Sequence, residues 1–240
     1  EVDFRRLHSL ALSWLSQGET DLLTRLFFTM GNQPTIPFPA FLDGGVRGFM
    51  RMVGEEWESG RLQVGEEHMA TQVVTEALIR LRGDWDTLLP ARTASSDPRP
   101  VAVVGGMEGD THELGALSIR VLLERDGWRV YYLGADVPME EFSAVQQGQV
   151  ASLVCVSLSP RNTLPDLQRA VKVLGEFYRP HYPYSLALGG AVMENADPEG
   201  LLKGPFESFS LSRSANEFQA WVRTLPRAPE PKANDPRRVA

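Results

Sequence analysis

Short apolar runs alternate with longer amphipathic segments from Pro100 onward, and this alternation limits the fold more than any other feature of the sequence. The apolar runs predict strands near residues 101–104, 128–133, 151–157, 184–188 and 206–209. The segments between and after them predict helices near residues 112–125, 138–147, 164–177 and 215–225. Because strands that alternate with helices form a parallel sheet covered on both faces, we expect a flavodoxin-like, doubly wound α/β domain over residues 100–226.

The first 85 residues have a different pattern, in which apolar residues recur at helical spacing. Leucines at 7, 10, 12 and 15 mark a first helix, and further helices are expected near residues 21–30, 41–58 and 64–82. Four helices joined by short connections predict an antiparallel four-helix bundle over residues 1–85, so that the fold class is α + α/β. Residues 86–99 indicate a linker, and the Pro-rich, charged residues 227–240 a disordered tail.

Charge and cysteine content exclude several classes of protein. The chain has 24 Lys and Arg against 31 Asp and Glu, a net charge of -7, which disfavours nucleic-acid binding by this chain. The single cysteine, Cys155, rules out a disulfide within the chain and, with no visible signal peptide or membrane-spanning stretch, favours a cytoplasmic protein. Cys155 lies in an apolar run and is expected to be a small buried residue rather than a reactive thiol.

Ligands of open parallel sheets bind outside the carboxyl ends of the strands. The segments at that edge are Gly105–Gly115, Ser157–Pro160 and Gly189–Gly190. No G-x-G-x-x-G pattern follows the first strand, which disfavours a dinucleotide site. Asp110 and His112 are more informative, because a metal-ligating imidazole usually donates its other ring proton to a carboxylate. A lone loop histidine is more often structural, so this pair alone does not decide the chemistry.

The wider pattern does distinguish a metal-ligating His112 from a structural one. Asp110-x-His112-x-x-Gly115, followed by Ser157 and then by Gly189-Gly190, resembles the motif of base-off, His-on cobalamin-binding domains. The resemblance implies that His112 is the lower axial ligand of cobalt, in place of the cofactor's own dimethylbenzimidazole. It further implies that the displaced nucleotide tail enters a slot lined by Ser157 and the Gly189–Gly190 turn. Further cofactor contacts are expected at Thr111 and at Ser159, which stands where the family usually has Leu.

The helical region carries a second resemblance. Trp57-x9-Glu67-His68 is similar to the signature of CarH-type light-sensing domains, which hold adenosylcobalamin between a four-helix bundle and the cobalamin fold. Val64, Glu67, His68 and Thr71 follow the i, i+3, i+4, i+7 rule and are expected to share one helix face. The resemblance implies that Trp57 caps the adenosyl group, that Glu67 accepts hydrogen bonds from its ribose hydroxyls, and that Val64 belongs to the same pocket. Singly, Trp57 and Glu67 would more often be structural.

One position departs from the CarH pattern. Glu58 follows Trp57, where the family has a histidine that ligates cobalt once the adenosyl group is lost. A bis-histidine photoproduct through this position is therefore not expected. No helix-turn-helix module precedes the bundle in this sequence, so direct DNA binding is not expected either.

Two functions compete. The leading hypothesis is a light sensor without enzymatic activity, in which photolysis of the cobalt–carbon bond of adenosylcobalamin rearranges the two domains. Such a sensor would form homo-oligomers, signal to an unidentified protein and act away from membranes. Because the related photocobilins pair cobalamin with a bilin, a bilin such as biliverdin is considered as a second chromophore here too. The alternative is a corrinoid shuttle protein of a methyltransferase system, against which Trp57 and Glu67-His68 argue, because a methyl group needs no ribose partner. A radical mutase subunit would need a substrate barrel that this chain lacks.

Overall fold

The computed structural model describes residues 2–86, 99–194 and 204–226. The expected linker falls almost wholly, and the expected tail fully, outside these residues. The described N-terminal part is a bundle of four long helices, α1 (Phe4–Ser16), α2 (Thr20–Gly31), α4 (Gly48–Glu58) and α5 (Val64–Asp86). A short helix α3 (Phe38–Ala40) and a π-helical segment η1 (Phe41–Arg47) lead directly into α4. The helix expected at 41–58 is therefore continuous, but its first part is wound more loosely than an α-helix.

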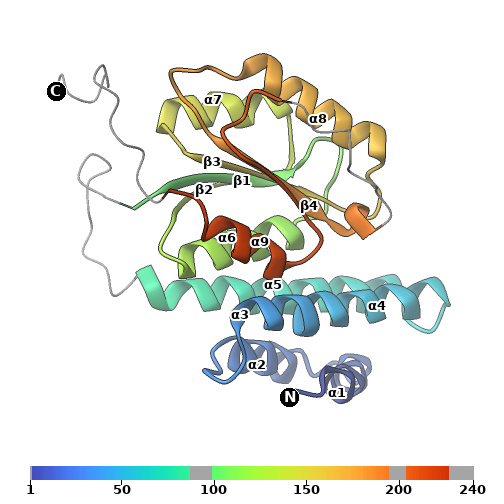
Figure 1. Ribbon diagram of the computed structural model, residues 1–240. Helices are drawn as coiled ribbons and strands as arrows, with labels where there is room; N and C mark the ends of the chain where they lie inside the picture. The colour runs from blue at the N-terminus through green and yellow to red at the C-terminus, as the bar shows by residue number, and fades with distance from the viewer. Residues whose placement is uncertain (1, 87–98, 195–203, 227–240) are drawn as a thin grey trace.

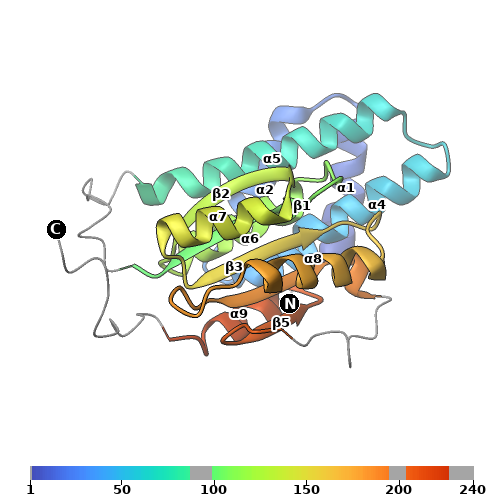
Figure 2. The ribbon, with the colours of Figure 1, turned by 90° about the horizontal axis from the view of Figure 1, so that it is seen from above.

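The C-terminal part is a parallel sheet with helices on both faces, as predicted (Figures 1 and 2). Its strands are β1 (Val101–Met107), β2 (Arg129–Val137), β3 (Leu153–Leu158), β4 (Ser185–Gly190) and β5 (Phe209–Ser212). Its helices are α6 (Leu114–Arg125), α7 (Met139–Gln149), α8 (Leu164–Phe177) and α9 (Ala215–Val222), with a 3₁₀ turn η3 (Ala191–Glu194) after β4. The strand order β2-β1-β3-β4-β5 is that of the flavodoxin-like fold.

Several element boundaries differ from the prediction, and the differences matter for the site. Strand β1 continues through Gly105 and Gly106 to Met107, and α6 begins at Leu114, so that His112 lies in a loop rather than in a helix. Likewise, Gly189 and Gly190 end β4 instead of forming a turn after it.

The last strand was predicted three residues too early. Phe206 packs against Tyr178 and Tyr184, with ring centroids 5.8 and 5.4 Å apart, and pairing with β4 begins only at Phe209. The aromatic side chains that suggested a strand at 206 therefore close an aromatic cluster beside the sheet.

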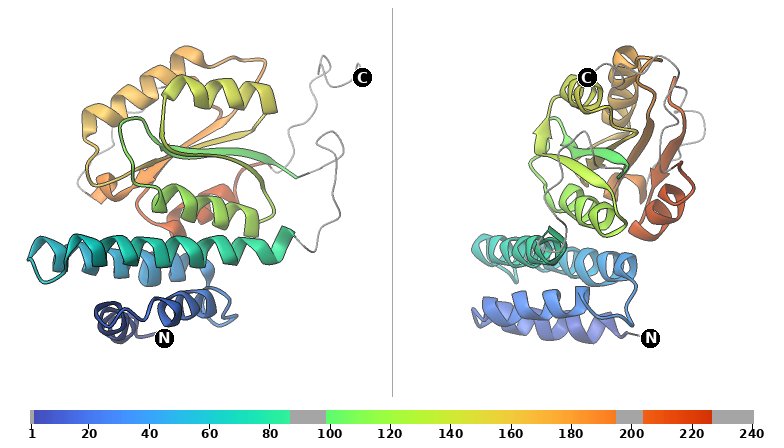
Figure 3. Two further views of the ribbon diagram at one scale, coloured as in Figure 1. Left: turned by 180° about the vertical axis from the view of Figure 1, so that it is seen from behind. Right: turned by 90° about the vertical axis from the view of Figure 1, so that its left-hand side faces the viewer.

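The molecule is layered. From bottom to top, Figure 1 shows α1 and α2, then α4 and α5, then α6 and α9, the sheet, and finally α7 and α8, and Figure 3 repeats the order from two further sides. One apolar core is continuous from the bundle to the sheet face that α6 and α9 cover, and a second lies between the sheet and α7 and α8. The bundle is therefore packed onto the α/β part over α5 and α6. No described helix is both long and apolar enough to cross a bilayer.

Hydrogen bonds join the bundle to the α/β part at several places, among them Arg47 to the Arg213 carbonyl and Arg125 to Asn32. Two further contacts matter most for the site. Along α5, the Arg82 guanidinium donates to the Glu124 carboxylate of α6 at 2.5 Å. At the other contact, Asp43 of η1 accepts hydrogen bonds from the backbone N–H groups of Ala215 and Asn216, at 2.7 and 3.1 Å, in the first turn of α9. A carboxylate is favoured there because it satisfies unpaired N–H groups at the positive end of a helix. We call this second contact the η1–α9 contact.

Candidate functional site: a cavity between the bundle and the sheet

A cavity of about 1350 Å³ separates the bundle from the carboxyl edge of the sheet. Its walls come from η1, α4 and α5 on one side, and from the segments that follow β1, β3, β4 and β5 on the other. Figure 1 shows the α4–α5 hairpin projecting past that edge. Pockets for drug-sized molecules measure roughly 300–1,000 Å³, so this cavity suits a larger ligand.

The cavity brings together almost every residue predicted for the site. One wall carries Trp57, Val64, Glu67 and His68, and the opposite side carries Thr111, His112, Gly115, Ser157, Ser159, Gly189 and Gly190. Asp110 does not line the cavity, since it is buried behind His112. The two groups lie far apart in the sequence, and the fold alone places them around one space.

Asp110 holds His112 as the spacing predicted. Its Oδ1 atom lies 2.7 Å from Nδ1 of His112 and accepts the backbone N–H of the same residue at 3.0 Å. With Nδ1 donating to the carboxylate, Nε2 keeps its lone pair. Asp110 is only 3% exposed, whereas 48% of the His112 side chain is open to the cavity. This is the arrangement of a metal-ligating histidine with a carboxylate behind it.

A second contact fixes the other oxygen of Asp110. Oδ2 accepts the backbone N–H of Ser159 at 3.1 Å, and the Ser159 hydroxyl accepts the N–H of Arg161. Burial raises the pKa of Asp110, but the hydrogen bonds from Ser159 and His112 together outweigh it and hold that pKa below its usual range. Ser159 therefore supports the Asp110–His112 pair through its backbone, which the sequence did not suggest.

Small residues in two rows form the cavity floor on the sheet. The pairing register aligns Ser157 with Gly189 and Gly189 with Ser212. Two residues earlier on the same face, it aligns Val104, Cys155 and Ala187 in a lower row. All six residues line the cavity.

Helices α6 and α9 form the sides of this deeper part of the cavity. They contribute Gly115, Ala116, Ser118 and Ile119 from α6, and Ala215 and Phe218 from α9. Figure 3 shows the two helices side by side on the same face of the sheet. We call this part, with its floor of Ser157, Gly189, Cys155 and Ala187, the slot.

The glycines of the motif are explained by close backbone approach. A Cβ at Gly115 would collide with the Ser157 hydroxyl, and one at Gly189 would lie 2.9 Å from the Ser212 carbonyl oxygen. At Gly190 the backbone φ is +132°, and a Cβ would strike the Leu158 carbonyl oxygen. Glycine at 190 is thus required by the backbone itself rather than by the open space that the sequence suggested.

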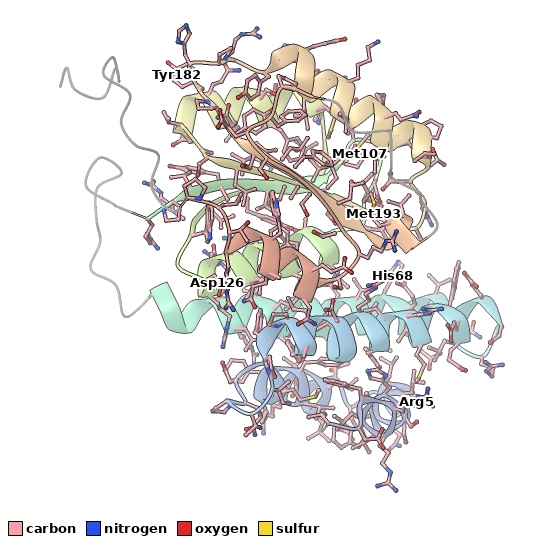
Figure 4. All side chains as sticks on the ribbon, in the orientation of Figure 1. Arg5, His68, Met107, Asp126, Tyr182 and Met193 are labelled. Carbon is pink, nitrogen blue, oxygen red and sulfur yellow. The ribbon has the colours of Figure 1, made fainter. Side chains whose placement is uncertain are left out.

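The wall opposite the sheet is exposed. Trp57 is 43% and Val64 is 54% exposed, although both are large apolar side chains. On α5, Glu67 accepts a hydrogen bond from the Thr71 hydroxyl at 3.1 Å and lies 2.5 Å from Nδ1 of His68. Figure 4 shows His68 on the side of α5 toward the α/β part. Val64, Glu67, His68 and Thr71 all line the cavity, so the predicted common helix face is confirmed.

The described residues fit a cobalamin better than a bare metal ion. No three His, Cys, Asp or Glu side chains within them are grouped so as to hold an ion directly. A cobalt that arrives inside a corrin ring needs only one protein ligand from below, and His112 offers its Nε2. The slot offers a narrow space beside it for a flat side group.

The sequence did not point to the lower row of the floor. Cys155 is buried as predicted, and burial raises the pKa of its thiol, yet it also lines the slot. Cys155 and Ala187 each lie two residues before a motif residue, so strand periodicity was the signal that could have identified them. Asp43 and Phe218 gave no comparable signal.

Comparison with known sequences decides the family. The model of a family described as B12 binding domain matches residues 100–205, and a second model of the same description matches residues 14–82. Dimethylamine corrinoid protein 3 of Methanosarcina mazei is 30% identical over 127 residues, which cover 53% of this chain and 73% of the relative. The chain belongs to the B12-binding proteins. Cobalamin, or a corrinoid like it, is therefore the ligand class of this B12-binding protein.

Two other relatives show how broad that family is. The HTH-type transcriptional repressor CarA of Myxococcus xanthus is 32% identical over 74% of this B12-binding protein, and dimethylamine corrinoid protein 1 of Methanosarcina acetivorans is 29% identical over 56%. The chain spans 56% and 61% of the lengths of these two relatives. The monomethylamine corrinoid protein of Methanosarcina barkeri has the same fold, with a TM-score of 0.62 at 15% identity over 92% of this chain and 97% of that one.

Proposed function

We propose that the chain is an adenosylcobalamin-binding light sensor. The observation that carries the proposal is that Trp57, Val64, Glu67 and His68 line the same cavity as His112, on the opposite wall. An exposed indole and a carboxylate on the same wall suit a group with both an aromatic base and hydroxyls. The 32% identity with the repressor CarA covers 74% of this chain, in keeping with a regulatory role.

Each site residue has a role in this proposal. His112 binds cobalt from below, and Asp110 fixes the ring orientation and the tautomer. Trp57 and Val64 cover the adenosyl group, and Glu67 accepts hydrogen bonds from its ribose. A bound adenosylcobalamin supplies a cobalt–carbon bond that light can break. We expect no catalysis by the chain itself.

The signal would be a change in how the bundle lies on the α/β part. Loss of the adenosyl group would uncover Trp57 and Val64 and remove the contacts that the group makes between the two walls. The apolar α5–α6 packing is the firmer attachment, so the bundle would move about it while the η1–α9 contact opens. The output would pass to another protein, in a homo-oligomer in the cytoplasm and without direct DNA binding.

The alternative function is a corrinoid shuttle protein, and the similarity to dimethylamine corrinoid proteins favours it. The two functions share the lower wall and differ at the upper one, where a shuttle must admit a partner enzyme to the cobalt. Exposed apolar groups at 57 and 64 would then contact that partner rather than a nucleoside.

A bilin such as biliverdin, as second chromophore, would have to bind without a covalent link. Cys155 lies on the cavity floor but is only 4% exposed, and burial raises the pKa of its thiol, which disfavours the thiolate that would form a thioether. Adding biliverdin to the purified protein and recording the visible spectrum tests this part of the proposal.

Absorption spectroscopy separates the two functions. Protein loaded with adenosylcobalamin is measured in the dark and after green light, beside protein loaded with methylcobalamin. We expect higher affinity for adenosylcobalamin, and a light-induced spectral change accompanied by a change in hydrodynamic radius or oligomeric state. Equal affinity for both cofactors, with no change of shape after photolysis, would refute the sensor and leave the shuttle.

A further inference from the structure

The slot differs in chemistry between its mouth and its floor. At the mouth, Ser157 and Ser212 present hydroxyl-bearing side chains from β3 and β5. In the lower row, Val104, Cys155 and Ala187 present two hydrocarbon side chains and one thiol. The β5 residue aligned with Ala187 is Ser210, whose hydroxyl is hydrogen-bonded to that of Ser212 and which does not line the cavity. Burial raises the pKa of that thiol, so it stays neutral.

The helices beside the slot also add mainly apolar groups to the cavity lining. Ile119 and Phe218 face it from α6 and α9, and the Ser118 hydroxyl is the polar side-chain group that α6 adds. A flat ring pushed down to the lower row would therefore meet methyl, methylene, aromatic and thiol surfaces with one hydroxyl beside them. A ring with several polar atoms would lose water there without gaining enough partners.

We propose that the slot selects corrinoids by their lower base, taking an apolar benzimidazole in preference to an adenine. Dimethylbenzimidazole carries two methyl groups on its far edge, which match the apolar lower row. Adenine carries an exocyclic amine and additional ring nitrogens, more polar atoms than the Ser118 hydroxyl can satisfy while the Ser210 hydroxyl is bonded to Ser212. The proposal rests on the proposed placement of the cofactor, with His112 below cobalt and the nucleotide tail in the slot.

The position that controls this choice is Ala187. It lies at the centre of the floor, beside Cys155 and two residues before Gly189, where a small change is felt by whatever fills the slot. Ala187→Ser adds one hydroxyl with little added volume. Ala102 is a matched control, since it is a fully buried alanine in the same apolar core, two residues before Val104, and does not line the cavity.

The test compares three corrinoids by titration on the full chain. They are cobalamin, the cobamide with adenine as lower base, and cobinamide, which has no nucleotide tail. For the wild type we expect cobalamin to bind roughly tenfold to a hundredfold more tightly than the adenine form, as for one or two unpaired polar groups. Ala187→Ser should narrow that ratio, Ala102→Ser should leave it unchanged, and cobinamide affinity should stay the same in both variants.

The outcomes separate this inference from the proposed function. If cobalamin and the adenine cobamide bind with equal affinity, and both more tightly than cobinamide, base selection is overturned but the placement of the tail in the slot is kept. Cobalamin binding no tighter than cobinamide would overturn the placement of the tail in the slot, whereas ligation by His112 is tested separately by the absorption titration of His112→Ala. A ratio that Ala187→Ser and Ala102→Ser change equally would show that selection lies elsewhere than in the lower row.

Discussion

The two walls of the cavity are built in different ways. On the sheet side, Asp110 is buried with both oxygens hydrogen-bonded, and small residues in register form the floor. On the bundle side, Trp57 and Val64 are exposed although they are apolar. The sheet side is therefore organised before a ligand arrives, whereas the bundle side is completed only when a ligand covers it.

This difference separates what the family shares from what distinguishes its members. The sheet side fits any corrinoid whose tail enters the slot, so it accounts for the class of ligand. In the proposed placement of the cofactor, the bundle side would meet the upper ligand of cobalt, which is where an adenosyl sensor and a methyl shuttle differ. Full burial of a side chain such as valine is worth about 1.5–3 kcal/mol, so an upper ligand that covers Trp57 and Val64 would hold the bundle closed by a comparable amount.

The largest effect should come from the sheet side. His112→Ala should lower cobalamin affinity by at least roughly 100-fold, because loss of even the outer partner of a metal-ligating histidine costs about 10- to 100-fold. The loss of cobalamin affinity in Asp110→Asn should fall within this range of about 10- to 100-fold. Absorption titration measures both, with His181→Ala, an exposed histidine outside the cavity, as the control. A wild-type spectrum and affinity in His112→Ala would remove His112 as the ligand.

The next effect concerns the bundle side and depends on the cofactor. Glu67→Gln and Trp57→Ala should weaken adenosylcobalamin binding about 10- to 100-fold and methylcobalamin binding much less, since a hydrogen bond to a charged group contributes about 1.5–3 kcal/mol. Glu76→Gln, on the same helix but outside this cavity, should leave the affinities for both cofactors unchanged. If the affinities for both cofactors fall equally, the contrast between the walls does not reflect the upper ligand, and the shuttle function is favoured.

A smaller effect is expected where the walls are joined. Asp43→Ala removes the carboxylate from the first turn of α9, and the loss of such a cap costs about 0.5–2 kcal/mol. We expect faster cofactor release and easier proteolysis between bundle and sheet, with little change in the dark spectrum. Asp21→Ala, in the first turn of α2, is the matched control. Unchanged release in Asp43→Ala would show that the η1–α9 contact does not help to hold the bundle.

The smallest effect should appear only after illumination. Glu58→His places an imidazole after Trp57, and its illuminated spectrum should become that of a bis-histidine complex while the dark spectrum stays the same. In the wild type, we expect water or His68 to bind the vacated position. His68 Nδ1 lies 2.5 Å from the Glu67 carboxylate in this structure, and we expect His68 to reach cobalt only after the bundle has moved. Illuminated spectra of His68→Ala and wild type, compared directly, decide between the two ligands.

Much of this architecture could be predicted from local patterns. The helix expected at 164–177 is present with those bounds, its start marked by a capping box between Thr163 and Asp166. The Asp110–His112 pair could be foreseen because two-residue spacing in a loop determines the contact almost alone. Strand β1 was predicted too short because Gly105 and Gly106 carry no apolar side chain to mark them as strand.

What could not be predicted depends on residues that meet only after folding. The Asp43 carboxylate and the α9 backbone are separated by most of the chain, and nothing near either predicts their contact. The placement of Cys155 and Ala187 in one row requires the register of three strands. The exposure of Trp57 depends on how the bundle is placed on the α/β part, and the periodicity of the sequence does not predict that placement.

The π-helical segment η1 has a consequence for how this cavity could be altered. An α-helix turns by about 100° per residue, and a π-helical stretch accommodates extra residues per turn. Deleting one residue from η1, at Gly44 for example, would restore α-helical winding and change the rotational phase of α4, and of Trp57 with it, relative to Asp43. The Asp43 carboxylate and the Trp57 indole then could not both face the cavity rim, so the length of this one segment sets whether bundle attachment and ligand cover are compatible.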